Sequence, residues 1–164
     1  AKHIITDDFF GIILADDLIL SEPGCLKQLL EIHEKTQSSV LGVFSASENQ
    51  VSNYGVISSK NIDGLEKVDG IVEKPKPADA PSNLAVFGRY ILSKDIFLNI
   101  EETKPGLNNE IQLTDAIQDL ISNQDVFALE FEGRRFDCGS KEGYISAIID
   151  RALSIDKYKS IIEK

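Results

Sequence analysis

The chain has 164 residues, which is the size of one ordinary domain or of part of a larger one. Apolar residues make up 42% and charged residues 27%, so the sequence can bury a core and is not typical of a disordered protein. The 17 basic and 27 acidic residues give a formal net charge of −10, which argues against nucleic acid and anionic membrane surfaces as partners.

The first predicted elements form a β-α-β unit. Residues 9–15 are a short continuous apolar run, which predicts a strand buried on both faces, as in parallel sheets. Ser21-Glu22-Pro23 is typical of a helix start, and residues 26–33 then place apolar side chains along one helix face. Residues 40–44 predict a second apolar strand. This order of elements favours an α/β fold.

The middle of the chain is predicted to be rich in strands. Residues 54–57, 65–73 and 84–92 are apolar segments separated by polar loops that contain glycine and proline. Residues 75–81 contain three prolines, and we expect an extended loop there. Proline can neither continue a helix nor donate a hydrogen bond within a central strand.

The rest of the chain returns to helices with one strand between them. Ser93 is predicted to cap a short helix over residues 95–100, and a second helix is expected over about residues 113–121. Residues 126–131 predict a strand, and Ser140 opens the last long helix. The apolar stripe of that helix consists of Ile145, Ile148, Ile149, Ala152 and Leu153. No repeat or linker interrupts the sequence, so residues 1–164 are interpreted as one domain.

The cysteines and the N-terminus favour a cytoplasmic protein. Cys25 and Cys138 form no CxxC pair, no zinc spacing and no disulfide framework, which favours a reduced compartment. The longest apolar run, residues 9–15, is far shorter than the roughly 20 residues that span a membrane. No signal peptide is visible. The chain has no methionine, so Ala1 is interpreted as an end produced by processing, by design or by a cut.

Aspartates stand at the ends of two predicted strands. Asp16 and Asp17 follow the first strand, at the edge where open α/β sheets bind ligands. A carboxylate there can hold Mg²⁺ together with phosphate oxygens, although a turn or a helix cap is the commoner use of aspartate at such a place. Asp137 ends a later strand, and the two strand ends could share a metal ion. The alternative for Asp137 is an ion pair with Arg134 or Arg135, and these arginines either clamp a phosphate or form a solvated turn.

Glu73 and Lys74 end another predicted strand, just before Pro75. Strand side chains alternate between faces, so the pair can share one loop only if the strand breaks there, and Pro75 supplies such a break. A carboxylate can accept two sugar hydroxyls, and an ammonium suits a phosphate. A charged, solvent-facing strand exit is the commoner use of such residues. Gly55 opens a strand and either permits close approach of a ligand or serves as a turn glycine.

No side-chain nucleophile is indicated. The sequence suggests no Ser–His–Asp or Cys–His arrangement and contains no glycine-rich phosphate loop. His33 fits the edge of a helix stripe better than the role of a general base. An acidic chain that handles phosphates would therefore need a few well-placed cations or a bound metal ion.

Taken in chain order, these segments resemble the bacterial UTP–glucose-1-phosphate uridylyltransferases, from the first residues to about residue 153. The strings Ala-Pro-Ser-Asn-Leu-Ala, Glu-Ile-Gln-Leu-Thr-Asp and Asp-Cys-Gly-Ser favour this family over the related thymidylyltransferases and adenylyltransferases. The matching segments are residues 14–17, 54–57, 72–75, 80–85, 88–90, 110–115 and 131–140.

The resemblance implies a fold and a reaction. The fold is α/β, a Rossmann-like nucleotidyltransferase fold with a mixed, mostly parallel central sheet flanked by helices. The reaction converts UTP and glucose 1-phosphate to UDP-glucose and pyrophosphate, with Mg²⁺ as cofactor. Small-molecule substrates and a homo-oligomer are implied, and neither nucleic acid nor a membrane is. Such chemistry needs positioning and charge neutralisation more than a nucleophilic side chain.

The resemblance also implies the roles of individual residues. Asp16 and Asp137 would hold the metal ion and, with Lys74, form the catalytic set. Glu73 would accept the glucose hydroxyls, and Lys74 would meet the sugar phosphate. The backbone groups implied to help Glu73 are those of Gly55 and Val86.

Three departures from the family pattern qualify these expectations. Ala15 replaces a usual proline, and Asn109 a usual glycine. The opening strand and its Gly-x-Gly-Thr-Arg loop are absent from this sequence. We therefore expect an incomplete domain that lacks an N-terminal β-α-β portion, carries the sugar-phosphate and metal half of the site, and turns over slowly or not at all. Residues 9–15 would then be an inner strand without one neighbour, and the isolated chain would self-associate or be poorly soluble.

Two other functions stay open at this point. The chain can belong to another sugar-1-phosphate nucleotidyltransferase that uses dTTP or ATP, because the base-selecting residues are expected outside this sequence. It can also be a non-catalytic acidic domain that binds a sugar phosphate or a protein. That last function predicts that Asp16, Glu73, Lys74 and Asp137 do not converge.

Overall fold

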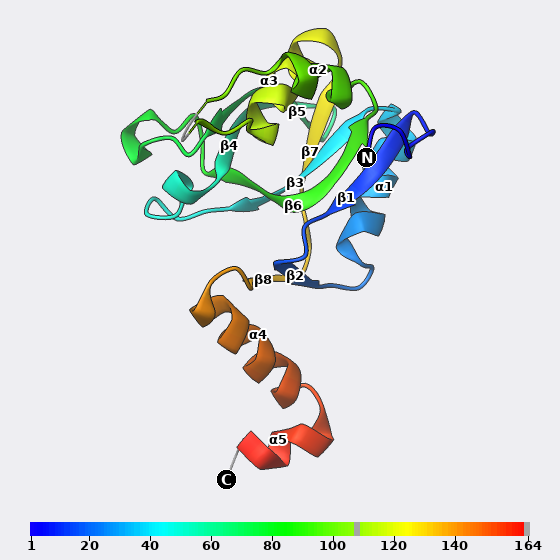
Figure 1. The fold of residues 1–164 in the computed structure, drawn as a ribbon. Helices are drawn as coiled ribbons and strands as arrows, with labels where there is room; N and C mark the ends of the chain where they lie inside the picture. The colour runs from blue at the N-terminus through cyan, green and yellow to red at the C-terminus, as the bar shows by residue number, and fades with distance from the viewer. Residues whose placement is uncertain (107–108, 163–164) are drawn as a thin grey trace.

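A computed structural model of the chain describes residues 1–106 and 109–162. Six strands form its main sheet in the order β1-β6-β3-β7-β5-β4, and β6 also pairs with β4, so five of the strands close into a barrel (Figure 1). The strands are β1 (Phe9–Ile13), β3 (Ser39–Ser45), β4 (Gly55–Ile62), β5 (Leu65–Glu73), β6 (Leu84–Ser93) and β7 (Val126–Glu130).

The sheet is mixed, but the predicted mostly parallel arrangement is wrong. Only β3 and β7 run parallel, and every other pair of neighbouring described strands in this sheet is antiparallel. One cause is visible between β4 and β5, where Asp63 and Gly64 both have positive φ and join the paired ends Ile62 and Leu65. An Asp-Gly turn of this kind joins adjacent antiparallel strands.

The predicted β-α-β unit is present, with two corrections. The first strand, β1, is an edge strand that pairs with β6 alone among the described strands, and its residues are at most half-buried rather than buried on both faces. The helix, α1 (Cys25–Thr36), begins after Gly24 and not at Ser21. A strand that the sequence did not predict, β2 (Asp17–Leu20), runs up to residue 20 and keeps the chain extended there.

This additional strand belongs to a second, two-stranded sheet. β2 pairs antiparallel with β8 (Arg134–Asp137), and Asp17 lies opposite Asp137. Figure 1 shows this β2–β8 ribbon beside the barrel, with α4 (Lys141–Leu153) and α5 (Asp156–Ile162) extending away from it. The ribbon thus places Asp17 next to Asp137, which lies 120 positions later in the chain.

Helices and strands predicted elsewhere are confirmed, with changes at their ends, and β4 continues to Ile62, beyond the predicted residues 54–57. The cap predicted at Ser93 is wrong, because Ser93 ends β6 and the helix that follows begins after Asp95. Two helices, α2 (Ile96–Glu102) and α3 (Leu113–Asn123), pack on one side of the sheet. Ser140 caps α4 as predicted, since its hydroxyl accepts a hydrogen bond from the amide of Gly143 at 3.0 Å. Short 3-10 turns cover Val51–Asn53 and Pro77–Asp79, the second inside the predicted extended loop.

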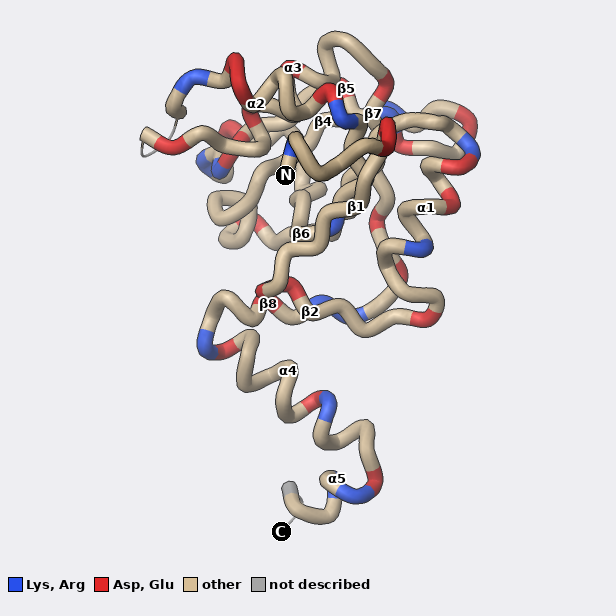
Figure 2. Tube along the Cα trace, turned by 45° about the vertical axis from the view of Figure 1, so that its right-hand side comes forward, with Lys and Arg blue, Asp and Glu red and all other residues tan. Residues whose placement is uncertain are grey.

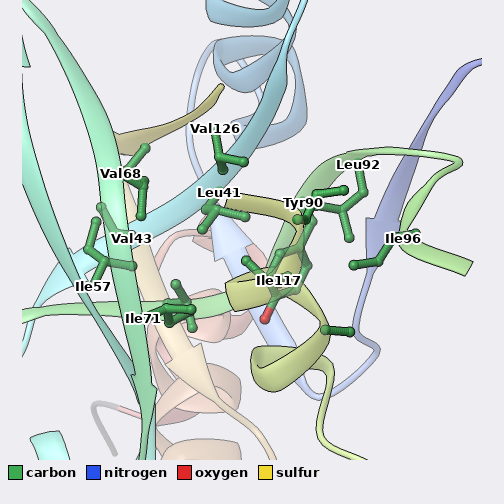
Figure 3. Close-up of a cluster of buried hydrophobic side chains, with 14 residues drawn as sticks. Leu41, Val43, Ile57, Val68, Ile71, Tyr90, Leu92, Ile96, Ile117 and Val126 are labelled. Atoms are coloured by element: carbon green, nitrogen blue, oxygen red, sulfur yellow. The ribbon is translucent and has the colours of Figure 1, made fainter. Parts of the chain in front are cut away.

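The largest cluster of buried side chains lies between α3 and the sheet. Figure 3 shows Ile117 of α3 beside Leu41, Tyr90 and Leu92 of the strands. These side chains are almost completely buried, so this region is the core that holds the barrel against its helices.

The apolar stripe predicted for the last long helix is largely exposed. Ile145, Ile148, Ile149 and Leu153 of α4 each expose more than two fifths of their surface, whereas Ala147 is buried. A subunit interface on this stripe stays a prediction. No helix in the described part of the chain is long and apolar enough to cross a membrane.

The two cysteines are unpaired and differ in burial. Cys25 at the start of α1 is buried, and burial raises the pKa of its thiol to about 11. Because the thiol has a higher pKa in the folded chain than in the unfolded chain, it contributes stability to the fold. This contribution is fully present below pH 9, the pKa in the unfolded chain, and is lost as the pH rises toward 11. We expect the urea midpoint of the chain to fall between pH 8 and pH 10.5.

The Cys25→Ala variant should lose part of this pH dependence, whereas the Cys138→Ala variant, at a half-buried site, should keep it. Urea titrations of the three proteins at both pH values measure the effect. Equal slopes for wild type and Cys25→Ala would show that this thiol does not titrate on unfolding.

Candidate active site

One pocket collects all six residues that the sequence singled out for a site. It has a volume of about 450 Å³ and lies where the ends of several barrel strands meet the β2–β8 ribbon. The predicted residues that line it are Asp16, Gly55, Glu73, Lys74, Val86 and Asp137. The expectation of a non-catalytic domain, in which the four charged residues do not converge, is therefore not met.

Glu73 and Lys74 share this pocket because the chain bends at Lys74. The backbone of Lys74 has φ +44°, a left-handed conformation that is strained for a residue with a side chain. Its amide donates to the carbonyl oxygen of Tyr54 at 3.0 Å, and its ammonium lies 3.5 Å from Oε1 of Glu73. The sequence predicted that the strand breaks at Pro75. In the structure the chain bends one residue earlier, at Lys74, and the side chains of Glu73 and Lys74 both line the pocket.

Thr114 fixes the other oxygen of Glu73. Its hydroxyl donates to Oε2 of Glu73 at 2.6 Å, and the Glu73 side chain is only 14% exposed. A Cβ added to Gly55 would lie 3.0 Å from Val86 and 3.2 Å from Thr114, so the backbone of Gly55 borders the pocket where a larger residue would crowd its neighbours. Sequence reasoning missed Thr114, although the string Glu-Ile-Gln-Leu-Thr-Asp that contains it was among the resembling segments.

The second aspartate of the Asp16-Asp17 pair is a structural residue of the pocket wall. Asp17 is 7% exposed; its Oδ1 accepts from Nε of Arg135 at 2.5 Å, and its Oδ2 accepts from the amide of Gly88 at 2.8 Å. Arg89 donates to the carbonyl oxygens of Leu14 and Asp17. These contacts hold the turn that presents Asp16 to the pocket.

Asp137 is held by three groups. The hydroxyl of Tyr54 donates to its Oδ2 at 2.9 Å, the amide of Gly139 donates to its Oδ1 at 3.1 Å, and Nη2 of Arg135 lies 3.9 Å from Oδ2. Burial raises the pKa of the Tyr54 phenol, which keeps this donor protonated. The predicted ion-pair alternative is thus present in a long form with Arg135, while Arg134 pairs instead with Asp150.

Arg135 is not part of a solvated turn, and its guanidinium contacts protein groups beside the pocket. Its side chain is 12% exposed and its guanidinium lies over the rings of Phe44, Tyr54 and Phe87, at 4.6, 4.9 and 5.8 Å from the ring centres. Burial alone would lower its pKa, but hydrogen bonding to Tyr54 and Asp17 and the charge of Asp17 raise it overall. Arg135 therefore stays charged, and its guanidinium donates hydrogen bonds to Asp17 and Tyr54.

Comparison with known proteins identifies the family of the chain. The family described as nucleotidyl transferase matches residues 1–152. The chain belongs to the nucleotidyl transferase family.

Within this family the chain is homologous to UTP–glucose-1-phosphate uridylyltransferases. It is 47% identical over 149 residues to the enzyme of that name from Pseudomonas aeruginosa, covering 89% of this chain and 53% of the relative. It is 42% identical over 165 residues to "UTP--glucose-1-phosphate uridylyltransferase 2" of Streptococcus pyogenes, covering 97% and 55%. The chain thus spans about half the length of the curated relatives it matches.

Solved structures of nucleotidyl transferases have the same fold. A UDP-glucose pyrophosphorylase complexed with UDP-glucose matches with a TM-score of 0.90 and 44% identity, over 94% of this chain and 60% of the other. A UTP-bound UGPase from Acinetobacter baumannii matches with a TM-score of 0.83 and 33% identity, over 99% and 59%. The expected nucleotidyltransferase fold of mixed α/β type is confirmed, apart from the direction of the strands.

The residues present fit a magnesium ion of the kind expected for nucleotidyl transferases. A Cβ added to Gly139 would lie 3.1 Å from Oδ1 of Asp137 and 3.3 Å from Oδ2 of Asp16, so the two carboxylates border one small space beside Gly139. The described residues contain no cluster of three or more acidic, His or Cys ligands. Two carboxylates completed by phosphate oxygens and water are a normal donor set for Mg²⁺.

Proposed function

We propose that this chain forms the sugar-phosphate and metal side of a UTP–glucose-1-phosphate uridylyltransferase site. The observation that carries the proposal is the arrangement of four charged residues around one pocket. Glu73 and Lys74 meet at one end of it, and Asp16 and Asp137 border the space above Gly139. The homology to enzymes of this name supports the choice of reaction.

The pocket supplies separate groups for the sugar and its phosphate. One oxygen of Glu73 accepts from Thr114, and the carboxylate retains acceptor capacity for hydroxyls of glucose. The ammonium of Lys74 is 41% exposed at the pocket and would donate to the phosphate of glucose 1-phosphate. The bend at Lys74 sets these two recognition groups side by side.

The reaction joins two phosphates. An oxygen of the glucose 1-phosphate phosphate forms a bond to the α-phosphorus of UTP, and the bond from that phosphorus to the oxygen bridging to the β-phosphate breaks, which releases pyrophosphate. Mg²⁺ held by Asp16 and Asp137 would neutralise charge on the two phosphates. Lys74 would hold the attacking phosphate and Glu73 the glucose that carries it, so the chain would act by positioning rather than through a covalent intermediate.

Binding of UDP-glucose tests this proposal directly on the 164-residue chain. We expect calorimetry to detect UDP-glucose binding that is stronger in Mg²⁺ than in EDTA. A chimera with this chain in place of the matched 149 residues of the Pseudomonas aeruginosa enzyme should release pyrophosphate from UTP and glucose 1-phosphate.

The competing functions give different results. A site for another nucleotide sugar is tested in a complete enzyme, because the base-selecting residues are expected outside this sequence, and that enzyme would use dTTP or ATP in preference to UTP. A non-catalytic sugar-phosphate domain would bind glucose 1-phosphate with no dependence on Mg²⁺, and its chimera would be inactive.

A further inference from the structure

The β2–β8 ribbon needs side-chain contacts to hold it against the barrel. It is a sheet of its own, and it carries Asp17 and Asp137, with Asp16 immediately before it. Arg135 of β8 reaches out of the ribbon into a box of three aromatic rings: Phe44 of β3, Phe87 of β6 and Tyr54, just before β4. A buried guanidinium stacked in this way is a rigid anchor.

Hydrogen bonds continue from this anchor to the carboxylate of Asp137. The amide of Gly88 donates to Asp17, and Nε of Arg135 donates to the other oxygen of Asp17 at 2.5 Å. Nη1 of Arg135 donates to the hydroxyl oxygen of Tyr54 at 3.3 Å, and that hydroxyl donates to Oδ2 of Asp137 at 2.9 Å. The proton of Tyr54 is directed at Asp137 because the guanidinium can only donate.

Tyr54 also contacts the opposite side of the pocket. Its carbonyl oxygen accepts the amide of Lys74 at 3.0 Å, and Gly55 follows it directly in the chain. One residue therefore supports the bend that carries Lys74 and, through its side chain, the carboxylate on the ribbon.

We propose that Tyr54 and Arg135 are positioning residues, which orient the carboxylate of Asp137 toward a divalent cation. They also fix the position of this carboxylate relative to the Glu73–Lys74 bend. The inference rests on the proposed function, because it takes Asp137 as a ligand. Neither residue touches the cation; both act through Asp137. Outer groups that orient a metal ligand commonly change metal affinity about 10- to 100-fold when they are removed.

The Tyr54→Phe variant isolates the hydroxyl. It keeps the ring that stacks on Arg135 and meets Phe44 edge-on, so the aromatic box stays filled. We expect Mn²⁺ binding in the presence of UDP-glucose, measured by electron paramagnetic resonance, to weaken about 10-fold. UDP-glucose binding in EDTA should change less than twofold. Tyr144→Phe, the same substitution on exposed α4, should change neither.

Tyrosine emission gives a second measurement, because the chain has four tyrosines and no tryptophan. A cation at Asp137 perturbs the hydroxyl that donates to the same carboxylate. Mg²⁺ should therefore change the emission of the wild-type chain and of Tyr144→Phe, and leave that of Tyr54→Phe unchanged.

A second variant tests the arginine. Arg135→Lys keeps the charge beside Asp17 but loses the planar fork that also reaches Tyr54, so it should bind Mn²⁺ more weakly than wild type while its circular dichroism is unchanged. Wild-type Mn²⁺ affinity in both variants would overturn the positioning role. If both variants bind Mn²⁺ like wild type but Asp137→Asn does not bind it, the positioning role is wrong and the proposed function is retained. If the wild-type chain itself binds no Mn²⁺, both the positioning role and the proposed function are contradicted.

Discussion

Replacing Asp137 by asparagine should lower the Mg²⁺-dependent binding of UDP-glucose, and pyrophosphate release by the chimera, at least about 100-fold. Removing an outer group that merely orients a metal ligand costs about 10- to 100-fold, so removing the ligand itself should cost more. Asparagine keeps the shape, and its one carbonyl oxygen can still accept either from the amide of Gly139 or from the hydroxyl of Tyr54, which bind different oxygens of Asp137. What disappears is the negative charge beside Asp16, on the space above Gly139.

Asp119→Asn is a matched control, because Asp119 is an exposed carboxylate of α3 outside this pocket. It should leave Mg²⁺-dependent binding within a factor of two of wild type. Calorimetry of both variants in Mg²⁺ and in EDTA separates loss of the metal from loss of the sugar site. Undiminished Mg²⁺ dependence in Asp137→Asn would remove Asp137 from the metal ligands.

Individual helices and strands could be predicted from the sequence because the spacing of apolar residues within one segment indicates its type. The strand predicted over residues 65–73 is β5 without change, and Ser140 caps α4 as expected. Whether two strands pair parallel or antiparallel depends on segments that lie far apart in the chain. The β-α-β pattern therefore led to the prediction of a mostly parallel sheet, which is wrong. The Asp63-Gly64 turn was a usable signal for an antiparallel pair between two predicted strands.

The candidate site could be predicted only in part, for a related reason. Asp16, Glu73, Lys74 and Asp137 were noticed because each stands at the end of a predicted strand. β2 was missed because its four residues carry no periodic signal, yet its pairing with β8 sets Asp17 opposite Asp137.

The supporting residues were beyond local patterns altogether. Thr114 reaches Glu73 across 41 positions, and Tyr54 reaches Asp137 across 83. No spacing rule relates residues that far apart, so these contacts follow from the closed barrel and not from a motif.

The net charge of −10 gains a clearer meaning in the structure. Figure 2 shows acidic and basic residues distributed over the barrel, the ribbon and the helices. Of the described residues that line the pocket, only Lys74 and Arg135 are cations, and Arg135 donates hydrogen bonds to Asp17 and Tyr54. In the proposed function, attraction of an anionic substrate into this pocket would therefore depend on Lys74 and on a bound divalent cation.

Replacing Lys74 by methionine should accordingly weaken glucose 1-phosphate binding about 10- to 100-fold. A hydrogen bond to a charged group contributes roughly 1.5–3 kcal/mol, and about 1.4 kcal/mol corresponds to a factor of ten. Methionine has nearly the same shape and meets the same backbone strain at φ +44°, so the bend should persist. Glu73 loses the ammonium at 3.5 Å but keeps the hydroxyl of Thr114, and the fold should be little affected.

The control for this variant is Lys76→Met, two residues along the same loop, where the exposed side chain lies outside the pocket. Calorimetric titration with glucose 1-phosphate at low and high ionic strength measures the difference between the two lysines. Salt weakens an attraction between exposed charges, so wild type and Lys76→Met should lose affinity as salt rises, and Lys74→Met should lose less. If Lys74→Met and Lys76→Met bind glucose 1-phosphate with the same affinity, another group holds the phosphate. The bend at Lys74 would then position only Glu73.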